Sequence, residues 1–120
     1  MKIIRSFAFA WSGLRYCFLT QTNFRIHLLF AALAILLGIC FNISIPEWLA
    51  VLLCIGSVLI LELLNTAIER LCDVVQKDFH PGIKIIKDIA AGAVLVSALV
   101  SVCIGTVIFL PKIIHFIKPV

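Results

Sequence analysis

The feature that most constrains this chain is a set of long runs that contain no Asp, Glu, Lys or Arg. They cover residues 26–46, 48–61 and 89–111. A helix needs about 20 mostly apolar residues to cross the hydrocarbon core of a bilayer. The first and third runs reach that length alone, whereas the second reaches it only if Glu62 lies inside the span. Because 63% of the 120 residues are hydrophobic, against roughly 45–50% apolar residues in soluble domains, the sequence predicts a membrane protein.

Turn residues mark where the helices end. Asn42 and Ser44 form a polar turn, and Pro46 suits the first turn of the helix that follows. A second break lies at residues 80–82, and Pro111 is expected to end or kink the last helix. We therefore expect an all-α membrane fold in a single domain, residues 1–120. Its elements are an N-terminal helix over 1–20 and membrane helices over 24–41, 47–75 and 83–110.

The N-terminal segment has the pattern of an amphipathic helix. One side carries large apolar residues at spacings of three and four, namely Ile3, Ile4, Phe7, Trp11, Leu14 and Phe18. The other side carries Lys2, Arg5 and Ser12. This pattern is typical of a helix that lies in the membrane interface rather than across it.

The positive charges predict an orientation in the membrane. The N-terminal segment and residues 70–87 each carry four Lys or Arg, whereas residues 42–46 carry none. By the positive-inside rule, the N-terminus and the second loop face the cytoplasm, and the short loop and the C-terminus lie outside. Lys112 and Lys118 oppose this orientation, because they place two positive charges outside. The net charge of +4 does not indicate nucleic-acid binding, since no basic stripe interleaved with aromatic residues accompanies it.

Polar residues recur along one face of the second membrane helix. At 100° per residue, Glu62, Asn65, Thr66, Glu69 and Asp73 fall in one sector. We call these five residues the polar stripe; from Glu62 to Asp73 it covers about 16 Å at 1.5 Å per residue. An acidic residue at the centre of a span costs about 2.5–3.5 kcal/mol on insertion scales. Glu62 is therefore expected to have a partner or a function.

Two interpretations of the polar stripe remain open. It could hold helices together by hydrogen bonds, with Arg70, Lys84 and Lys87 as ion-pair partners. Alternatively, carboxylates one to two turns apart can hold a hard divalent cation, and a lysine such as Lys87 can bind phosphate oxygens. Metal ligands, a phosphate clamp and a base are the parts of a phosphoryl-transfer site. We favour this second interpretation, although the chain has no Walker-type glycine loop.

Several segments together resemble a known family. They are ELLNTAIE at 62–69, followed by Asp73, and KDIAAGAVL at 87–95, with WSGL at 11–14 and NFR at 23–25. This combination is similar to the prokaryotic diacylglycerol kinase and undecaprenol kinase family over residues 2–110.

The resemblance implies a small integral-membrane kinase with an interfacial helix and three membrane helices. It implies a homotrimer whose active sites are shared between subunits. It also implies that Mg²⁺ and ATP are used to phosphorylate a lipid alcohol at the cytoplasmic face of the bacterial inner membrane. The expected partners are thus the lipid, ATP, the membrane and further copies of the chain, without nucleic acid.

The family's roles can be carried over by position. Glu62 would be the general base that takes the proton of the lipid hydroxyl, and Asn65 would orient the site. Glu69 would be the principal Mg²⁺ ligand, and Lys87 would contact the nucleotide phosphates. The nucleotide end would be completed by Asp73, Asp78, His80 and Asp88. His80 could equally be a residue that starts the next helix.

Two positions depart from the family pattern. Gln21 stands where the family usually has a second metal-binding glutamate; its carbonyl oxygen can still bind Mg²⁺ but brings no charge. Lys2 stands where the family can carry an arginine near the nucleotide or the lipid, so the charge survives. The change at Gln21 leaves open a weakly active member, or a membrane scaffold without catalysis.

The lipid substrate is indicated only by similarity. The stretches NFRIH at 23–27 and KDIAAGAVL at 87–95 are more similar to the undecaprenol kinase branch than to the diacylglycerol kinase branch. We therefore expect undecaprenol rather than diacylglycerol. His27, in the first of these stretches, is expected to lie at the cytoplasmic interface without a catalytic role.

Overall fold

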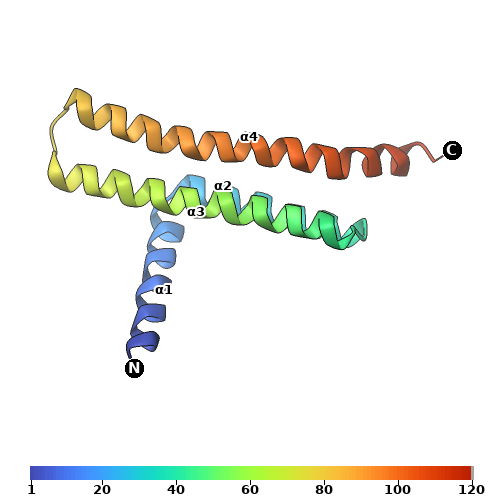
Figure 1. The fold of residues 1–120 in the computed structure, drawn as a ribbon, viewed down its shortest axis with the longest axis horizontal. Coiled ribbons are helices and arrows are strands. Elements are labelled where there is room, and N and C mark those ends of the chain that lie inside the picture. Colours follow the sequence, from blue (N-terminus) through green and yellow to red (C-terminus); the bar gives the residue numbers. More distant parts are fainter. Residues whose placement is uncertain (120) are drawn as a thin grey trace.

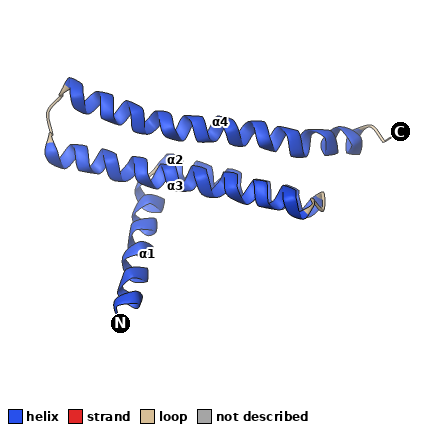
Figure 2. Cartoon of the chain, viewed as in Figure 1, coloured by secondary structure: helices blue, strands red, loops and turns tan. Residues whose placement is uncertain are grey.

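The computed structural model describes residues 1–119, and within that range it contains helices and no strand. The helices are α1 (Lys2–Thr20), α2 (Thr22–Cys40), α3 (Ile45–Val75) and α4 (Pro81–Ile117). α2, α3 and α4 lie along one another, whereas α1 leaves this layer and points away from it (Figure 1). The elements are joined by short loops (Figure 2). The predicted all-α class is confirmed.

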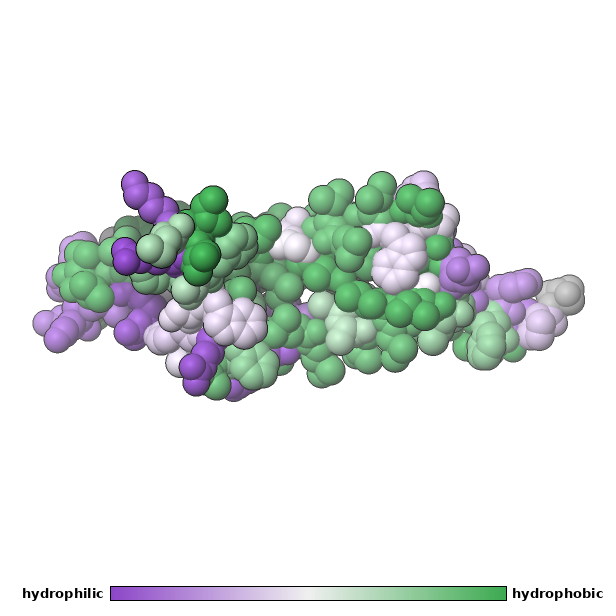
Figure 3. All heavy atoms as spheres, turned by 90° about the horizontal axis from the view of Figure 1, so that it is seen from below, coloured by the Kyte–Doolittle hydropathy of each residue, from purple (hydrophilic) through white to green (hydrophobic). Residues whose placement is uncertain are grey.

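The last three helices are long and apolar enough to cross a membrane, as predicted. α3 has 31 residues and α4 has 37, which correspond to about 46 and 55 Å at 1.5 Å per residue. The hydrocarbon core is only about 30 Å thick, so both helices project beyond it. Hydrophobic side chains cover most of the middle of the molecule, and hydrophilic ones gather toward its two ends (Figure 3).

Side-chain caps start α3 and α4 two residues before the predicted positions. The Ser44 hydroxyl accepts a hydrogen bond from the Glu47 backbone N–H at 3.4 Å, and the Glu47 carboxylate faces the Ser44 backbone N–H in return. This capping box satisfies N–H groups that have no helical partner. At α4, Nδ1 of His80 accepts from the Gly82 N–H at 3.0 Å. α2 likewise begins two residues earlier than predicted and ends at Cys40.

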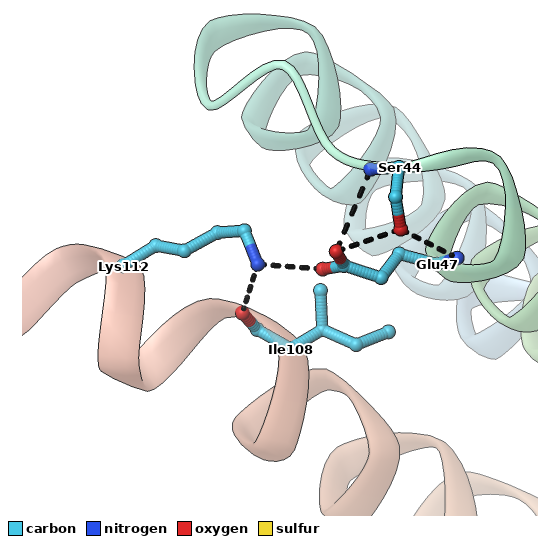
Figure 4. Close-up of polar contacts among 4 residues, drawn as sticks. All are labelled: Ser44, Glu47, Ile108 and Lys112. Atoms are coloured by element: carbon cyan, nitrogen blue, oxygen red, sulfur yellow. Dashed lines mark hydrogen bonds and ion pairs between the residues drawn. The ribbon is translucent and has the colours of Figure 1, made fainter.

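The prediction that Pro111 ends the last helix at residue 110 is wrong, because α4 continues to Ile117. Proline cannot donate the backbone hydrogen bond of its turn, but contacts beyond it hold the helix in place. Nζ of Lys112 donates to a Glu47 carboxylate oxygen at 2.6 Å and to the Ile108 carbonyl at 3.2 Å (Figure 4). The Phe116 ring packs edge to face on Phe41, with centroids 6.4 Å apart.

α3 is the centre of the fold. In the apolar stretch of α3 that could span the membrane, 28% of the residues are buried. The corresponding shares are 11% in α2 and 17% in α4. A small core at the end opposite the α3–α4 loop contains Ile43, Val51, Ile108 and Phe109. Most other large apolar side chains face outward. In a membrane these faces contact lipid or other subunits.

An arginine fixes the junction of α1 and α2. Nη1 of Arg25 donates to the carbonyls of Phe18 and Leu19, at 3.0 and 3.3 Å. The last carbonyls of a helix have no helical partner, so the guanidinium replaces the missing donors. The Arg70 guanidinium lies 5.7 Å from the centroid of the Tyr16 ring, which joins α1 to α3. The C-terminal end of α1 is thereby held beside the shallow end of the polar stripe.

Candidate functional site

The polar stripe passes from buried to exposed along α3. Glu62 and Thr66 are each 3% exposed and Asn65 is 9% exposed. Glu69 is half-buried and Asp73 is exposed. One face of a single helix therefore carries oxygen ligands from the interior of the bundle to the end that bears the α3–α4 loop.

The deepest residue of the polar stripe faces a histidine from another helix. Nε2 of His27, on α2, lies 3.9 Å from Oε2 of Glu62. The Thr66 hydroxyl donates to the Glu62 backbone carbonyl at 3.0 Å and is thus engaged by its own helix. Among the hydrogen bonds formed within residues 1–119, none reaches a Glu62 carboxylate oxygen. The sequence placed His27 at the cytoplasmic interface and did not predict this contact with Glu62.

The next turn holds an oxygen without a partner. Nδ2 of Asn65 donates to Oε1 of Glu69 at 3.4 Å, while Oδ1 of Asn65 is buried and accepts no hydrogen bond within the described part of the chain. An unpaired buried polar atom costs roughly 1–3 kcal/mol, so this position favours a donor or a cation. An amide oxygen beside a carboxylate is a donor set that Mg²⁺ accepts.

The carboxylates of residues 1–119 are spread along the helices rather than clustered around one point. Residues 1–119 bring together no group of three or more His, Cys, Asp or Glu side chains that could hold a metal ion. Mg²⁺ needs near-octahedral oxygen ligation and commonly takes only one or two protein carboxylates together with water and phosphate oxygens. The Asn65 and Glu69 oxygens therefore fit part of such a shell.

At the exposed end, α3 and α4 are joined by an ion pair. Nζ of Lys87 lies 2.7 Å from Oδ1 of Asp73, so two predicted nucleotide residues meet across the loop. Lys84 pairs instead with Asp88 of its own helix, at 2.6 Å. The structure thus assembles lysine and aspartate side chains of both helices next to solvent.

The remaining predicted site residues are more scattered. Asp78 and His80 lie exposed in the α3–α4 loop, and His80 caps α4 as described. Gln21 lies between α1 and α2, where its Nε2 donates to the Thr20 hydroxyl at 3.2 Å. Lys2 begins α1 and is exposed; it lies about 28 Å along that helix from Gln21 at 1.5 Å per residue. Within one chain, Lys2 is therefore remote from the polar stripe.

An apolar cleft of about 310 Å³ lies between α2, α3 and α4. Ligand pockets typically have volumes of about 300–1,000 Å³ with mostly apolar walls. Its walls include Ala34, Val58, Leu59 and Phe109, and His27 lines it as well. Because His27 also faces Glu62, the cleft adjoins the deep end of the polar stripe.

The sequence is similar to those of known kinases. The sequence model of the prokaryotic diacylglycerol kinase family matches residues 8–109. An undecaprenol kinase of Bacillus subtilis is 42% identical over 93% of this chain and 91% of its own length. A diacylglycerol kinase of Synechocystis is 39% identical over 93% of this chain and 65% of its own length. A diacylglycerol kinase of Escherichia coli K12 is 27% identical over 84% of this chain and 83% of its own length.

The family match covers most of the described structure. It contains all of α2 and α3, the whole polar stripe, and α4 as far as Phe109. Membership of a kinase family implies ATP as the co-substrate. The chain therefore belongs to the prokaryotic diacylglycerol kinase family, and it is a membrane-embedded lipid kinase.

Proposed function

We propose that this kinase transfers the γ-phosphate of ATP to the hydroxyl of undecaprenol, with diacylglycerol as the alternative acceptor. The observation that carries the proposal is the gradient along the polar stripe. Glu62 is buried, whereas Asp73 and Lys87 meet next to solvent. Such a face can bring a hydroxyl held in hydrocarbon to a phosphate that arrives from water.

At the deep end, Glu62 takes the proton of the lipid hydroxyl as general base. Its carboxylate is free of hydrogen bonds from residues 1–119, and the apolar cleft adjoins it through His27. A general base acts by direct contact with the proton it removes. Asn65, one turn closer to solvent, orients the reacting groups.

At the shallow end, Lys87 binds the nucleotide phosphates. An ammonium group is a compact charge that binds phosphate oxygens well. Asp73 holds this ammonium at 2.7 Å, which positions it before the nucleotide arrives. Asp78, His80 and Asp88 line the same end, and Lys2 contributes from α1.

Mg²⁺ fits the middle of the polar stripe. The unpaired Oδ1 of Asn65 lies on the same face as the Glu69 carboxylate, and we assign the ion to Glu69 with Gln21 as a neutral second ligand. When bound, Mg²⁺ neutralises charge on the phosphates during transfer. Gln21 lies at the α1–α2 junction, which the Arg25 and Arg70 contacts hold beside α3.

The kinase acts as a homotrimer with sites shared between subunits. One observation supports this assembly: the apolar faces of the helices are largely exposed in one chain. The small residues Ala90, Ala91, Gly92 and Ala93 allow close helix approach in a membrane.

The site faces the cytoplasm of the bacterial inner membrane. The positive-inside rule places the N-terminus and the α3–α4 loop there and the C-terminus outside. Lys112, which opposed this orientation, is paired with Glu47 at 2.6 Å, so its charge is compensated at the outer end. α1, whose Phe7 and Trp11 are 72% and 70% exposed, lies in the inner interface.

The substrate is tested by a two-lipid assay. The full-length chain in mixed micelles receives γ-labelled ATP, Mg²⁺ and either undecaprenol or diacylglycerol at equal mole fraction, with Glu69→Ala as control. We expect higher kcat/KM for undecaprenol and loss of product in the variant. Faster turnover of diacylglycerol would overturn the choice of lipid. Absence of Mg²⁺-dependent product from both lipids would overturn the proposed function.

A further inference from the structure

His27, on α2, lies beside Glu62 at the buried end of the polar stripe. Its Nε2 lies 3.9 Å from Oε2 of Glu62, and the two side chains are 23% and 4% exposed. This separation is too long for a hydrogen bond and is within the range of an ion pair. His27 is also the more accessible member of the pair.

The other polar neighbours of Glu62 are engaged elsewhere. The Thr66 hydroxyl donates to the Glu62 backbone carbonyl, not to the carboxylate. The Asn65 amide nitrogen donates to Glu69. His27 is therefore the side chain within residues 1–119 that faces the Glu62 carboxylate and remains free to exchange a proton with it.

A general base inside a membrane must carry a negative charge before it can accept a proton. An isolated carboxylate in hydrocarbon is costly. If the proton moves from the Glu62 carboxyl to the His27 imidazole, the net charge of the pair stays the same, and the resulting imidazolium faces the carboxylate. The pair can therefore hold an ionised Glu62 at a lower electrostatic cost than Glu62 alone.

We propose that His27 is a further residue of the kinase reaction, which accepts from Glu62 the proton of the lipid hydroxyl and returns Glu62 to its carboxylate form. The inference rests on the proposed function. Since His27 acts through Glu62 and does not touch the reacting oxygen, it is a positioning residue. Its greater exposure and its place in the second turn of α2, near the cytoplasmic start of that helix, give the proton a path away from Glu62.

The O–H bond of the lipid alcohol breaks, and its proton binds a carboxylate oxygen of Glu62. The hydroxyl oxygen bonds to the γ-phosphorus, while the bond from that phosphorus to the bridging oxygen breaks and ADP leaves with the electron pair. The His27 imidazolium releases its proton to water, and the proton on the Glu62 carboxyl then binds the freed Nε2, which restores the pair of carboxylate and imidazolium.

The test compares His27→Gln and the matched His115→Gln with the wild-type chain in undecaprenol micelles. His115 lies exposed in the last turn of α4, so the same chemical change there should leave turnover unaltered. For His27→Gln we expect kcat to fall about tenfold or more, as for loss of a proton-transfer group, with KM for ATP unchanged. A purely structural role would instead lower the amount of folded protein and leave its kcat intact.

Two further measurements separate proton transfer from packing. Free imidazole should raise the kcat of His27→Ala and leave that of Glu62→Gln unchanged. The double variant Glu62→Gln, His27→Gln should retain the residual rate of Glu62→Gln, because residues that act as a unit are not additive. Wild-type kcat in His27→Gln, no imidazole rescue, or an additive loss would overturn the inference. A wild-type chain without lipid product would overturn the proposed function and this inference with it.

Discussion

Replacement of Gly38 by alanine tests how the outer end of the bundle is packed. A Cβ at position 38 would lie 2.7 Å from Cη2 and 2.9 Å from Cζ2 of Trp48, and 3.1 Å from Cδ1 of Ile43. Carbon atoms prefer separations of about 3.5–4.0 Å, so the closest contact is about 0.8 Å too short. Because the indole is rigid, it must move as a whole within the small core that it packs against.

The expected cost follows from two opposing effects. Overpacking costs about 1–3 kcal/mol, and the better helix propensity of alanine returns about 0.8–1.0 kcal/mol. We expect a net loss of up to about 2 kcal/mol, which changes the ratio of folded to unfolded protein by up to roughly 30-fold. Gly105→Ala is the matched control, because no atom lies within 4 Å of its Cβ; it should be neutral or stabilising.

The free energy of unfolding of both variants is measured by equilibrium unfolding in mixed micelles with increasing dodecyl sulfate. The kinase activity of the folded fraction of Gly38→Ala should equal that of wild type, because Gly38 lies about 16 Å along α2 from His27 at 1.5 Å per residue. A Gly38→Ala protein as stable as Gly105→Ala would refute the packing of Trp48 on α2. Lost activity in the folded fraction would refute the separation of this end from the site.

Three further predictions concern charged and polar positions. Lys87→Met should raise the KM for ATP roughly tenfold or more through loss of a charge-assisted phosphate contact, whereas Lys118→Met should not; equal KM values would remove Lys87 from the nucleotide site. Gln21→Glu should lower the Mg²⁺ concentration for half-maximal rate, and an unchanged requirement would show that Gln21 is not a ligand. Glu47→Lys or Lys112→Glu alone should lower the thermal midpoint. The double exchange should restore part of the loss, because the ion pair returns while the cap on Ser44 does not; no recovery relative to Glu47→Lys would refute the pairing in Figure 4.

Local sequence signals were sufficient for the number and type of helices. The charge-free runs and the turns near Ser44 and Pro81 determine where α2, α3 and α4 lie. The end of α4 could not be predicted from local signals, since proline normally ends a helix. The Lys112–Glu47 ion pair and the Phe116–Phe41 contact join residues distant in sequence.

In the candidate site, too, local features could be predicted from the sequence, whereas contacts between helices could not. The polar stripe was readable because its members lie on one helix, where spacing fixes their common face. The His27–Glu62 contact depends on how α2 packs against α3, which no spacing within one helix reveals. In the structure His27 follows the buried Phe24 by three residues, which places it on the face of α2 that packs inward. The proposed sharing of the site between subunits explains why Lys2 lies apart from the polar stripe in one chain.

The most direct test of the account is phosphate transfer by Glu62→Gln. Glutamine keeps the size and polarity of Glu62 but cannot take a proton from the lipid. We expect Mg²⁺-dependent transfer from γ-labelled ATP to undecaprenol to fall about 10²- to 10⁴-fold, the usual contribution of a general base, with the oligomeric state by light scattering unchanged. Lipid phosphorylation at the wild-type rate by a correctly assembled Glu62→Gln protein would contradict the assignment of Glu62 as the base.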